Sequence, residues 1–272
     1  MPTFATPEPI AVRIDAIEGS IRLVATDRAD TVVQVLPRDF SRDSDVWASE
    51  HTRVDFRDGK LVVSGAKRGL AFFRNCATDV EIALPARSRL QASLGSADLR
   101  AAGEFRDVRI ATASGDVQID AVTGNIKATN SSGSFTVHTV HGNAWIATAS
   151  GEVSVGELDG DLKFKAAGGS LTVRRLSGHL KAHTASGSVE VAAAVRGGVS
   201  AHTSSGEVTV GVAEGTAARL DIVTGSGAVS NDLQASDGPH QGDETLVLQV
   251  RSGSGDVSVR RANPARETVP AT

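Results

Sequence analysis

The sequence has 272 residues, of which 40% are hydrophobic but only 4% aromatic, and glycine occurs 28 times. Large side chains are therefore scarce and turn-forming residues plentiful, which favours thin β layers over a thick globular core. The formal net charge of −4 at pH 7 excludes a global attraction to nucleic acid or to an anionic membrane, so any basic surface must be local.

The first 111 residues predict an irregular beginning of a β fold. A short unit, glycine followed by apolar residues two and four positions later, occurs at Gly19, Gly59 and Gly95. A longer strand is expected at 31–35, and loop insertions are expected near 37–53 and 65–78. We predict that residues 1–111 form an N-terminal cap and irregular first coils, because an open stack of strands exposes unpaired backbone groups.

Residues 112–211 carry a regular repeat of the same unit. Two positions and four positions after each glycine the residue is almost always apolar, which predicts a strand with one buried face. After Gly187 the next glycine is delayed by one residue to Gly197, which predicts a bulge or a longer corner within 191–195. The glycines that recur every nine residues are Gly115, Gly124, Gly133, Gly142, Gly151, Gly160, Gly169, Gly178 and Gly187.

A longer period is visible two residues before each glycine. Small residues such as Ala113 and Ala149 alternate there with bulky ones such as Val122 and Leu158, so the true repeat is about eighteen residues. This predicts an all-β, single-chain parallel β-solenoid, resembling a β-helix, with about eighteen residues and two strands per coil and with irregular capping ends. We expect the glycines to provide the positive φ angles of the corners.

The remaining residues predict the other end of the stack. Residues 212–262 are expected to form C-terminal coils and a cap, with the repeat unit visible again at Gly255 and a polar loop at 234–244. Residues 263–272 are expected to be a disordered tail.

The repeat also resembles a known family. Its unit T-A-S-G-[DES]-V-x-[VI] stands at 112–119, 148–155 and 184–191, and R-S-G-S-G-D-V follows at 251–257. With the opening PEPIAVRIDAIEGSIRLVATDRADTVVQV, these units resemble the bacterial putative-adhesin family of β-strand-repeat proteins, a domain of unknown function. The resemblance implies a β-solenoid and an adhesin-like role, and it implies no catalytic residues.

Acidic residues near the corners raise the alternative of a carbohydrate-active enzyme, a polysaccharide hydrolase or lyase on a parallel β-helix. Asp116 and Glu152 follow the glycines of alternate coils, about 9.6 Å apart at the spacing of stacked strands. Asp and Glu after Ser-Gly are also ordinary solvated turn residues, and this interpretation is favoured. The turns lack the ladder of aspartates that calcium-binding β-rolls require.

Histidine and cysteine give no cofactor or metal prediction. His183 and His202 should stack on neighbouring strands, but the next position of that ladder is Lys165, whose charge would oppose a metal ion. The single cysteine, Cys76, is interpreted as a small hydrophobic residue rather than a nucleophile.

One surface stands out among the outward-facing positions. We call it the even face: the outward side chains of the strands that follow Gly124, Gly142, Gly160, Gly178 and Gly197. It predicts a partner-binding strip in which Trp145 lies exposed between Lys127 and Lys163, although a solvated basic face that discourages lateral strand pairing is the plainer alternative. The candidate residues are Lys127, Trp145, Lys163, Lys165, Lys181, His183 and His202.

These observations predict a non-catalytic, adhesin-like interaction module that presents a ladder of strands to a protein or glycan, with acidic partners included. We expect no nucleic-acid partner and no membrane insertion, and the oligomeric state is left open. The N-terminus has no basic start followed by an apolar run, and Cys76 is alone, so a cytoplasmic location is expected. The cell surface, reached by a non-classical route, is the alternative.

Overall fold

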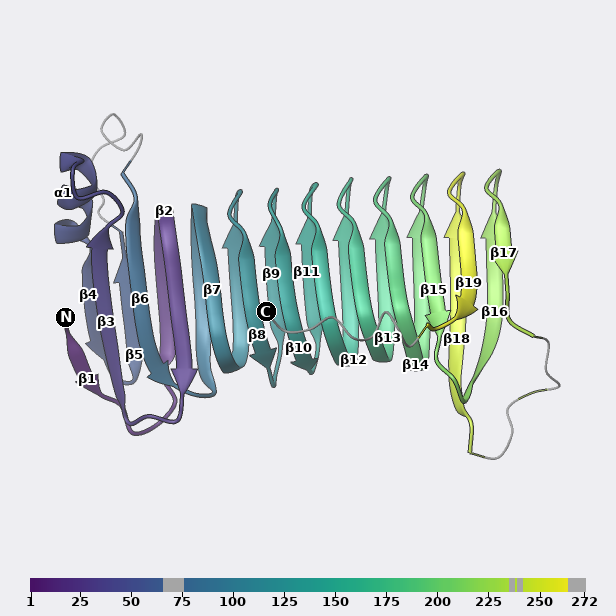
Figure 1. Ribbon diagram of the computed structural model, residues 1–272, viewed down its shortest axis with the longest axis horizontal. Coiled ribbons are helices and arrows are strands. Elements are labelled where there is room, and N and C mark those ends of the chain that lie inside the picture. Colours follow the sequence, from purple (N-terminus) through teal and green to yellow (C-terminus); the bar gives the residue numbers. More distant parts are fainter. Residues whose placement is uncertain (66–75, 235–237, 239–241, 264–272) are drawn as a thin grey trace. The chain divides into compact units, whose positions relative to one another are not determined.

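Figure 1 shows a computed structural model of the chain, which describes residues 1–65, 76–234, 238 and 242–263. The fold is almost entirely β-strand and divides into two compact units, Met1–Phe135 and Thr136–Thr272. Within each unit most strands run parallel in a stack, so the prediction of an all-β parallel stack is confirmed.

Unit 1 is built around β2 (Ala11–Thr26), which lies between β7 (Ser88–Thr112) on one side and β5 (Lys60–Ser64) and β6 (Thr78–Pro85) on the other. β7 continues the parallel stack with β8 (Val117–Val122) and β9 (Ile126–Asn130). Paired residues such as Leu99 and Val117 are eighteen positions apart, the spacing that the sequence repeat indicates.

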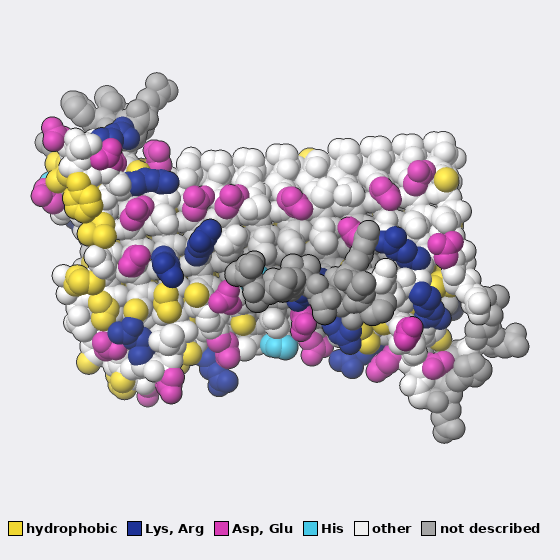
Figure 2. Space-filling view, viewed as in Figure 1, with side chains coloured by type: hydrophobic (Ala, Val, Ile, Leu, Met, Phe, Trp, Pro, Cys, Tyr) yellow, Lys and Arg dark blue, Asp and Glu magenta, His cyan; other side chains and the backbone are white. Residues whose placement is uncertain are grey.

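The end of unit 1 that contains the N-terminus is made of antiparallel strands. β3 (Asp30–Pro37) is antiparallel to β6, β1 (Thr3–Ala5) to β3, and β4 (Arg53–Arg57) to β5. These outer strands pair with backbone groups that the parallel strands alone would leave without partners, while the N-terminal cap at 1–111 stays a prediction. Figure 2 shows hydrophobic side chains gathered at this end on the face in view.

The insertion predicted as a loop at 37–53 contains a helix, α1 (Asp43–His51), so that prediction is wrong. Asp43 and Asp45 lie in its first turn and His51 in its last, which suits the helix dipole. Asp45 is 1% exposed, and its Oδ1 accepts a hydrogen bond from the backbone N–H of Ala77 at 3.0 Å. The helix therefore depends on a contact with a residue that is far away in the sequence, and its own residues form no apolar stripe that would predict it. Most of the insertion near 65–78 lies outside the described residues.

Unit 2 continues the strand repeat. Its elements are β10 (Phe135–His141), which begins at the last residue of unit 1, β11 (Ala144–Thr148), β12 (Val153–Ala166), β13 (Leu171–Thr184), β14 (Val189–Thr203), β15 (Val208–Val212), β16 (Thr216–Thr224), β17 (Val229–Asn231), β18 (Glu244–Ser252) and β19 (Val257–Arg261). β12 pairs with β13 in one register of eighteen residues from Val153–Leu171 to Ala166–Thr184.

The predicted bulge is confirmed between β13 and β14. Leu176 pairs with Ala194, but Ser177 pairs with Arg196, so Val195 is an extra residue in the corner. Beyond the bulge the spacing of paired residues is nineteen instead of eighteen, as the delayed Gly197 indicates.

The last strands in the sequence are not the outermost strands of unit 2. β18 lies between β14 and β16, and β19 lies between β15 and β17 (Figure 1). The chain thus passes outward through β16 and β17 and then returns to fill the intervening coil. Strands lie at 216–231 and 244–261, while most of the predicted polar loop between them lies outside the described residues, as does nearly all of the tail at 263–272.

The predicted alternation of inward and outward side chains is confirmed. In the regular block the residues two and four positions after each glycine are buried, from Val117 and Ile119 to Val208 and Val210. The largest buried side chains are Phe105 and Phe135 in unit 1 and Phe164 in unit 2, and each is completely inaccessible to solvent. Each thin core is therefore filled mainly by aliphatic side chains.

Glycine is required at the corners for two different structural reasons. Gly178 and Gly197 adopt φ angles of 146° and 98°, which favour glycine as predicted. Gly187 and Gly206 do not have positive φ; a Cβ on either would overlap the backbone carbonyl of the glycine one coil away, Gly169 or Gly187. The expected positive φ is therefore absent at Gly187 and Gly206, where close stacking of backbones excludes any side chain.

A buried threonine completes these tightly stacked corners. The Oγ1 of Thr184 accepts a hydrogen bond from the N–H of Gly187 at 2.9 Å, and Thr203 does the same for Gly206 at 2.8 Å. Both threonines are buried. The first residue of the T-x-x-G unit thus satisfies a backbone N–H that would otherwise be buried without a partner.

Candidate functional site

The even face is formed in unit 2 by two rows of side chains that the strand register aligns. One row runs through Trp145, Lys163, Lys181 and Ser200, and the other through Lys165, His183 and His202. The structure therefore brings together six of the seven predicted residues. Lys127 lies in unit 1 on β9, where it pairs with Arg109. Its expected position beside Trp145 stays a prediction.

Trp145 faces outward, because its neighbours Ala144 and Ile146 are the buried residues of β11. The side chain is half-buried, however, so the expectation that it lies exposed is wrong. Stacked strands are about 4.8 Å apart, and side chains in the same row therefore cover one another. A large ring in such a row loses more of its solvent contact than the alternation of the strand alone indicates.

The two histidines of the second row stack as the repeat predicts. The ring centroids of His183 and His202 are 4.9 Å apart, with an angle of 21° between the planes. Burial lowers the pKa of His183, and His202 and the three nearby lysines Lys181, Lys165 and Lys163 lower it further. His183 is therefore neutral at pH 7. Within the described residues no group of three or more His, Cys, Asp or Glu side chains is placed to hold a metal ion.

A shallow groove of about 680 Å³ lies over this row. Lys165, His183 and His202 line it, together with Val223 and Arg251. Arg251 pairs with His202 on one side and with Val223 on the other, which extends the row to β18 and β16. Sequence reasoning missed Arg251, because the repeat does not indicate that β18 lies beside β14.

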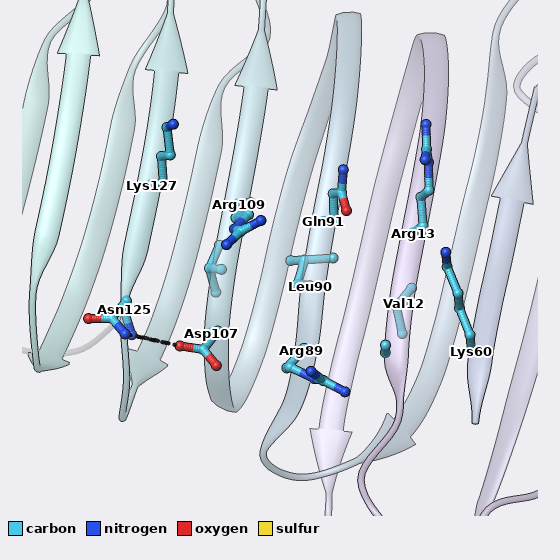
Figure 3. A pocket seen from close by; sticks show the side chains of 12 residues that line it. Val12, Arg13, Lys60, Arg89, Leu90, Gln91, Asp107, Arg109, Asn125 and Lys127 are labelled. Carbon is cyan, nitrogen blue, oxygen red and sulfur yellow. Dashed lines mark hydrogen bonds between the residues drawn. The ribbon is translucent and has the colours of Figure 1, made fainter. Parts of the chain in front are cut away.

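A second groove lies on unit 1 and is more strongly basic. Its volume is about 590 Å³, and Figure 3 shows its lining along β5, β2, β7 and β9. Five cationic side chains and one carboxylate, Asp107, surround it. The cationic residues are Arg13, Lys60, Arg89, Arg109 and Lys127. This site extends the predicted strip beyond Lys127 to four cations that the sequence analysis did not single out.

The charges of the unit 1 groove are only partly compensated. Asp107 accepts hydrogen bonds from the backbone N–H of Asn125 at 3.0 Å and from its Nδ2 at 3.5 Å (Figure 3), and Arg13 Nε donates to Asp15 Oδ2 at 3.1 Å. Within the described part of the chain, Lys60, Arg89 and Arg109 have no carboxylate partner. The groove is therefore a region of positive potential that suits an anionic group.

One signal for this groove was present in the sequence. Arg109 stands eighteen residues before Lys127, at the same outward position of the preceding coil. Lys60 and Arg89 have no such signal, because both flank Ala11 of β2 through pairings between segments that are far apart in the sequence.

The carboxylates of the enzyme alternative lie in different units, Asp116 in unit 1 and Glu152 in unit 2. Asp116 Oδ1 accepts hydrogen bonds from both the backbone N–H and the Oγ of Ser134 at 2.8 Å, and these bonds lower its pKa. Its own N–H donates to Asp98 Oδ1 at 3.0 Å. Hydrogen bonds thus link Asp98, Asp116 and Ser134 at successive stacked corners. This arrangement agrees with the favoured interpretation of Asp116 as a turn residue.

Cys76 is half-buried, and burial raises the pKa of its thiol, followed by the negative charges of Asp45 and Glu18. A raised pKa reduces the fraction of thiolate, the nucleophilic form. This environment suits the predicted role of a small hydrophobic residue.

Comparison with protein families identifies the repeat. The model of the family described as Toastrack DUF4097 matches residues 45–263. The chain belongs to the Toastrack DUF4097 family. The resemblance seen in the T-A-S-G units is thereby confirmed, and no curated protein matches the chain.

Solved structures similar to this Toastrack chain have low sequence identity. A "putative lipid binding protein" from Parabacteroides distasonis is 12% identical with a TM-score of 0.45, over 94% of this chain and 96% of that one. A "putative adhesin" from the same organism is 10% identical with a TM-score of 0.37, over 94% and 95%. A third, also a "putative adhesin", from Bacteroides fragilis, is 14% identical with a TM-score of 0.35, over 95% of each chain.

The described helix α1 does not have the length or the apolar character that crossing a bilayer requires.

Proposed function

We propose that this Toastrack chain is a non-catalytic binding module whose unit 1 groove binds an anionic partner, either an acidic protein segment or an acidic glycan. The observation that carries the proposal is the unit 1 groove, where five cations surround one carboxylate. Three of these cations lack a carboxylate partner within the described residues, so their charge is available to a ligand. Arginine is well suited to this role because its guanidinium binds carboxylate and sulfate groups in two-point contacts.

The strip on unit 2 is proposed as a second basic surface for the same class of partner. Lys163, Lys165 and Lys181 provide exposed charge, and the half-buried Trp145 provides a flat apolar contact. An aromatic ring flanked by cations is a common anchor at binding interfaces. His183, whose pKa is lowered, adds an uncharged hydrogen-bonding group beside the lysines at neutral pH.

The proposal of a binding module over an enzyme is supported by the state of the candidate carboxylates. Asp116 has a lowered pKa and is held by Ser134, whereas a general acid of a glycoside hydrolase needs a raised pKa. The finer features of the fold, one solenoid with about eighteen residues per coil and boundaries at 111, 211 and 262, stay predictions.

The experiment compares binding of the full chain to two fluorescent probes, a polyglutamate peptide and an oligosaccharide of uronic acids, with a neutral glucan as the blank. The variant Arg109→Glu should weaken binding by about tenfold or more, and added salt should weaken wild-type binding. Arg100→Glu is the matched control, because Arg100 is an exposed arginine on the same strand β7 but outside the groove.

The two probes distinguish the partner classes, since only one of them should bind tightly. Equal losses for Arg109→Glu and Arg100→Glu would show that net charge alone attracts the probes. Absence of binding to both probes at low salt, or release of shorter sugars from the uronic acid probe, would contradict the proposal.

A further inference from the structure

Strand β16 forms an open edge of unit 2. It pairs with β18, and within the described part of the chain it pairs with no other strand. Ala218, Leu220 and Ile222 face the same side as their partners on β18 but remain half-buried. Those partners, Leu246, Leu248 and Val250, are at most 1% exposed. The free side of β16 therefore combines unpaired backbone groups with incompletely covered apolar side chains, which is the usual template for strand addition.

The sequence of β16 is complementary to itself in one antiparallel register. If a two-fold axis passes beside Leu220, then Leu220 meets Leu220 of a second copy and Ala218 meets Ile222, a small residue opposite a large one. On the outward side Arg219 meets Asp221 of the second copy, and Asp221 meets its Arg219. Directly opposite residues of antiparallel strands interact most strongly, and opposite charges stabilise the pair.

In the two registers centred on Asp221 and on Arg219, repulsion between like charges disfavours pairing. Moving the axis to Asp221 places the two Asp221 carboxylates opposite each other, and moving it to Arg219 does the same to the two guanidinium groups. Charges on an edge strand normally prevent pairing, but here they permit the one register that also matches the apolar side chains.

The contacts that Arg219 and Asp221 make within their own chain do not prevent them from pairing with a second copy. Arg219 and Asp221 are both exposed. Asp221 is 3.7 Å from Arg251 of its own chain, with both side chains more than half exposed, while Arg219 has no carboxylate partner among the described residues. Asp221 of a second copy would provide that partner.

We propose that two copies of this chain associate through β16, in an antiparallel two-fold pairing centred on Leu220. The outer coil of β16 and β17 is then covered by its counterpart, and the half-buried Leu220 and Ile222 become fully enclosed. This interaction is independent of the proposed anion-binding function, because it uses the edge of β16 rather than the grooves.

The test uses sedimentation velocity of the full chain over a range of concentrations at low salt. Wild type should form dimers, and either Asp221→Arg or Arg219→Asp alone should raise the dimer dissociation constant by about tenfold or more, because each places like charges opposite one another. An equimolar mixture of these two variants should dimerise again. One chain then presents two arginines and the other two aspartates, so both pairs are complementary.

Glu152→Arg, which reverses an exposed charge at a corner away from β16, should dimerise as wild type does. Circular dichroism and thermal melting of each variant check that it is folded, since Asp221→Arg also removes the contact with Arg251. A wild type that stays monomeric at the highest concentration, single variants that dimerise normally, or a mixture that does not recover would overturn the proposal.

Discussion

His183 and His202 lie on adjacent strands with their rings stacked 4.9 Å apart, in a row that also contains Lys165 and Arg251. Protonation of His183 would place another positive charge among these cations. The Nδ1 atom of His202 is buried, and within the described residues it has no hydrogen-bond partner. His183 therefore couples the stability of unit 2 to pH.

The pH dependence follows from the lowered pKa of His183. In the unfolded chain this histidine takes up a proton near its ordinary pKa of 6.5, whereas in the folded chain it does so only at lower pH. The unfolded state therefore binds more protons between these two values, and stability is lost as pH falls from 6.5 through the pKa of the folded state. Urea denaturation between pH 7.5 and 5 should show this loss, which begins near pH 6.5.

The variant His183→Gln should flatten that dependence, because it removes the titrating group. His141→Gln, at an exposed corner of unit 2, is the matched control for the replacement of a histidine by glutamine. A wild type and a His183→Gln variant with parallel curves would contradict the proposed coupling.

Adjacent glycines at one corner should differ sharply in their tolerance of a methyl group. A Cβ at Gly169 would overlap the carbonyl oxygen of Gly151, whereas a Cβ at Gly168 would lie 3.7 Å from the Oγ of Ser186. Neither glycine has a positive φ, so the contrast isolates the stacking of backbones. We expect Gly169→Ala to lower the free energy of unfolding by about 3 kcal/mol and Gly168→Ala to change it by less than about 1 kcal/mol. Chemical denaturation measures both.

The buried corner threonines should contribute through their hydroxyl groups. Thr184→Val keeps the shape of the side chain but removes the acceptor for the N–H of Gly187, so it should cost about 1–3 kcal/mol of stability. Thr184→Ser keeps the acceptor and should cost less. Thr172→Val, at an outward position of the same strand, is the control and should be nearly neutral. If valine and serine at 184 are equally destabilising, the hydrogen bond is not the cause.

Trp145 should contribute to the binding of a partner at the even face, which can be measured when such a partner is identified. Trp145→Ala is expected to weaken binding by about 2 kcal/mol, as loss of an aromatic anchor does. Lys163→Glu, which changes its neighbour across the β11–β12 pair, should weaken binding in a manner that depends on salt. Titration calorimetry at two salt concentrations separates the two effects. Thermal melting of the free variants is the control, because a drop in melting temperature for Trp145→Ala would indicate a role in packing instead.

Local periodicity in the amino-acid sequence was enough to predict part of the fold. The alternation in each nine-residue unit predicted which side chains are buried, and the delayed Gly197 predicted the bulge that leaves Val195 unpaired. Alternation along a strand has only two outcomes, inward or outward, and the glycines set its phase. The alignment of His183 with His202 followed from the same count.

The tertiary structure alone decided which distant segments became neighbours. β2 lies between β5 and β7, and β18 lies between β14 and β16, so in each unit the order of the stacked strands departs from the order of the chain. These arrangements place Lys60 and Arg89 in one groove and Arg251 beside His202. A repeat defines how a strand pairs but not with which partner, because any unit of the same pattern offers similar backbone hydrogen bonds. The choice depends on burial of whole coils, which no local pattern records.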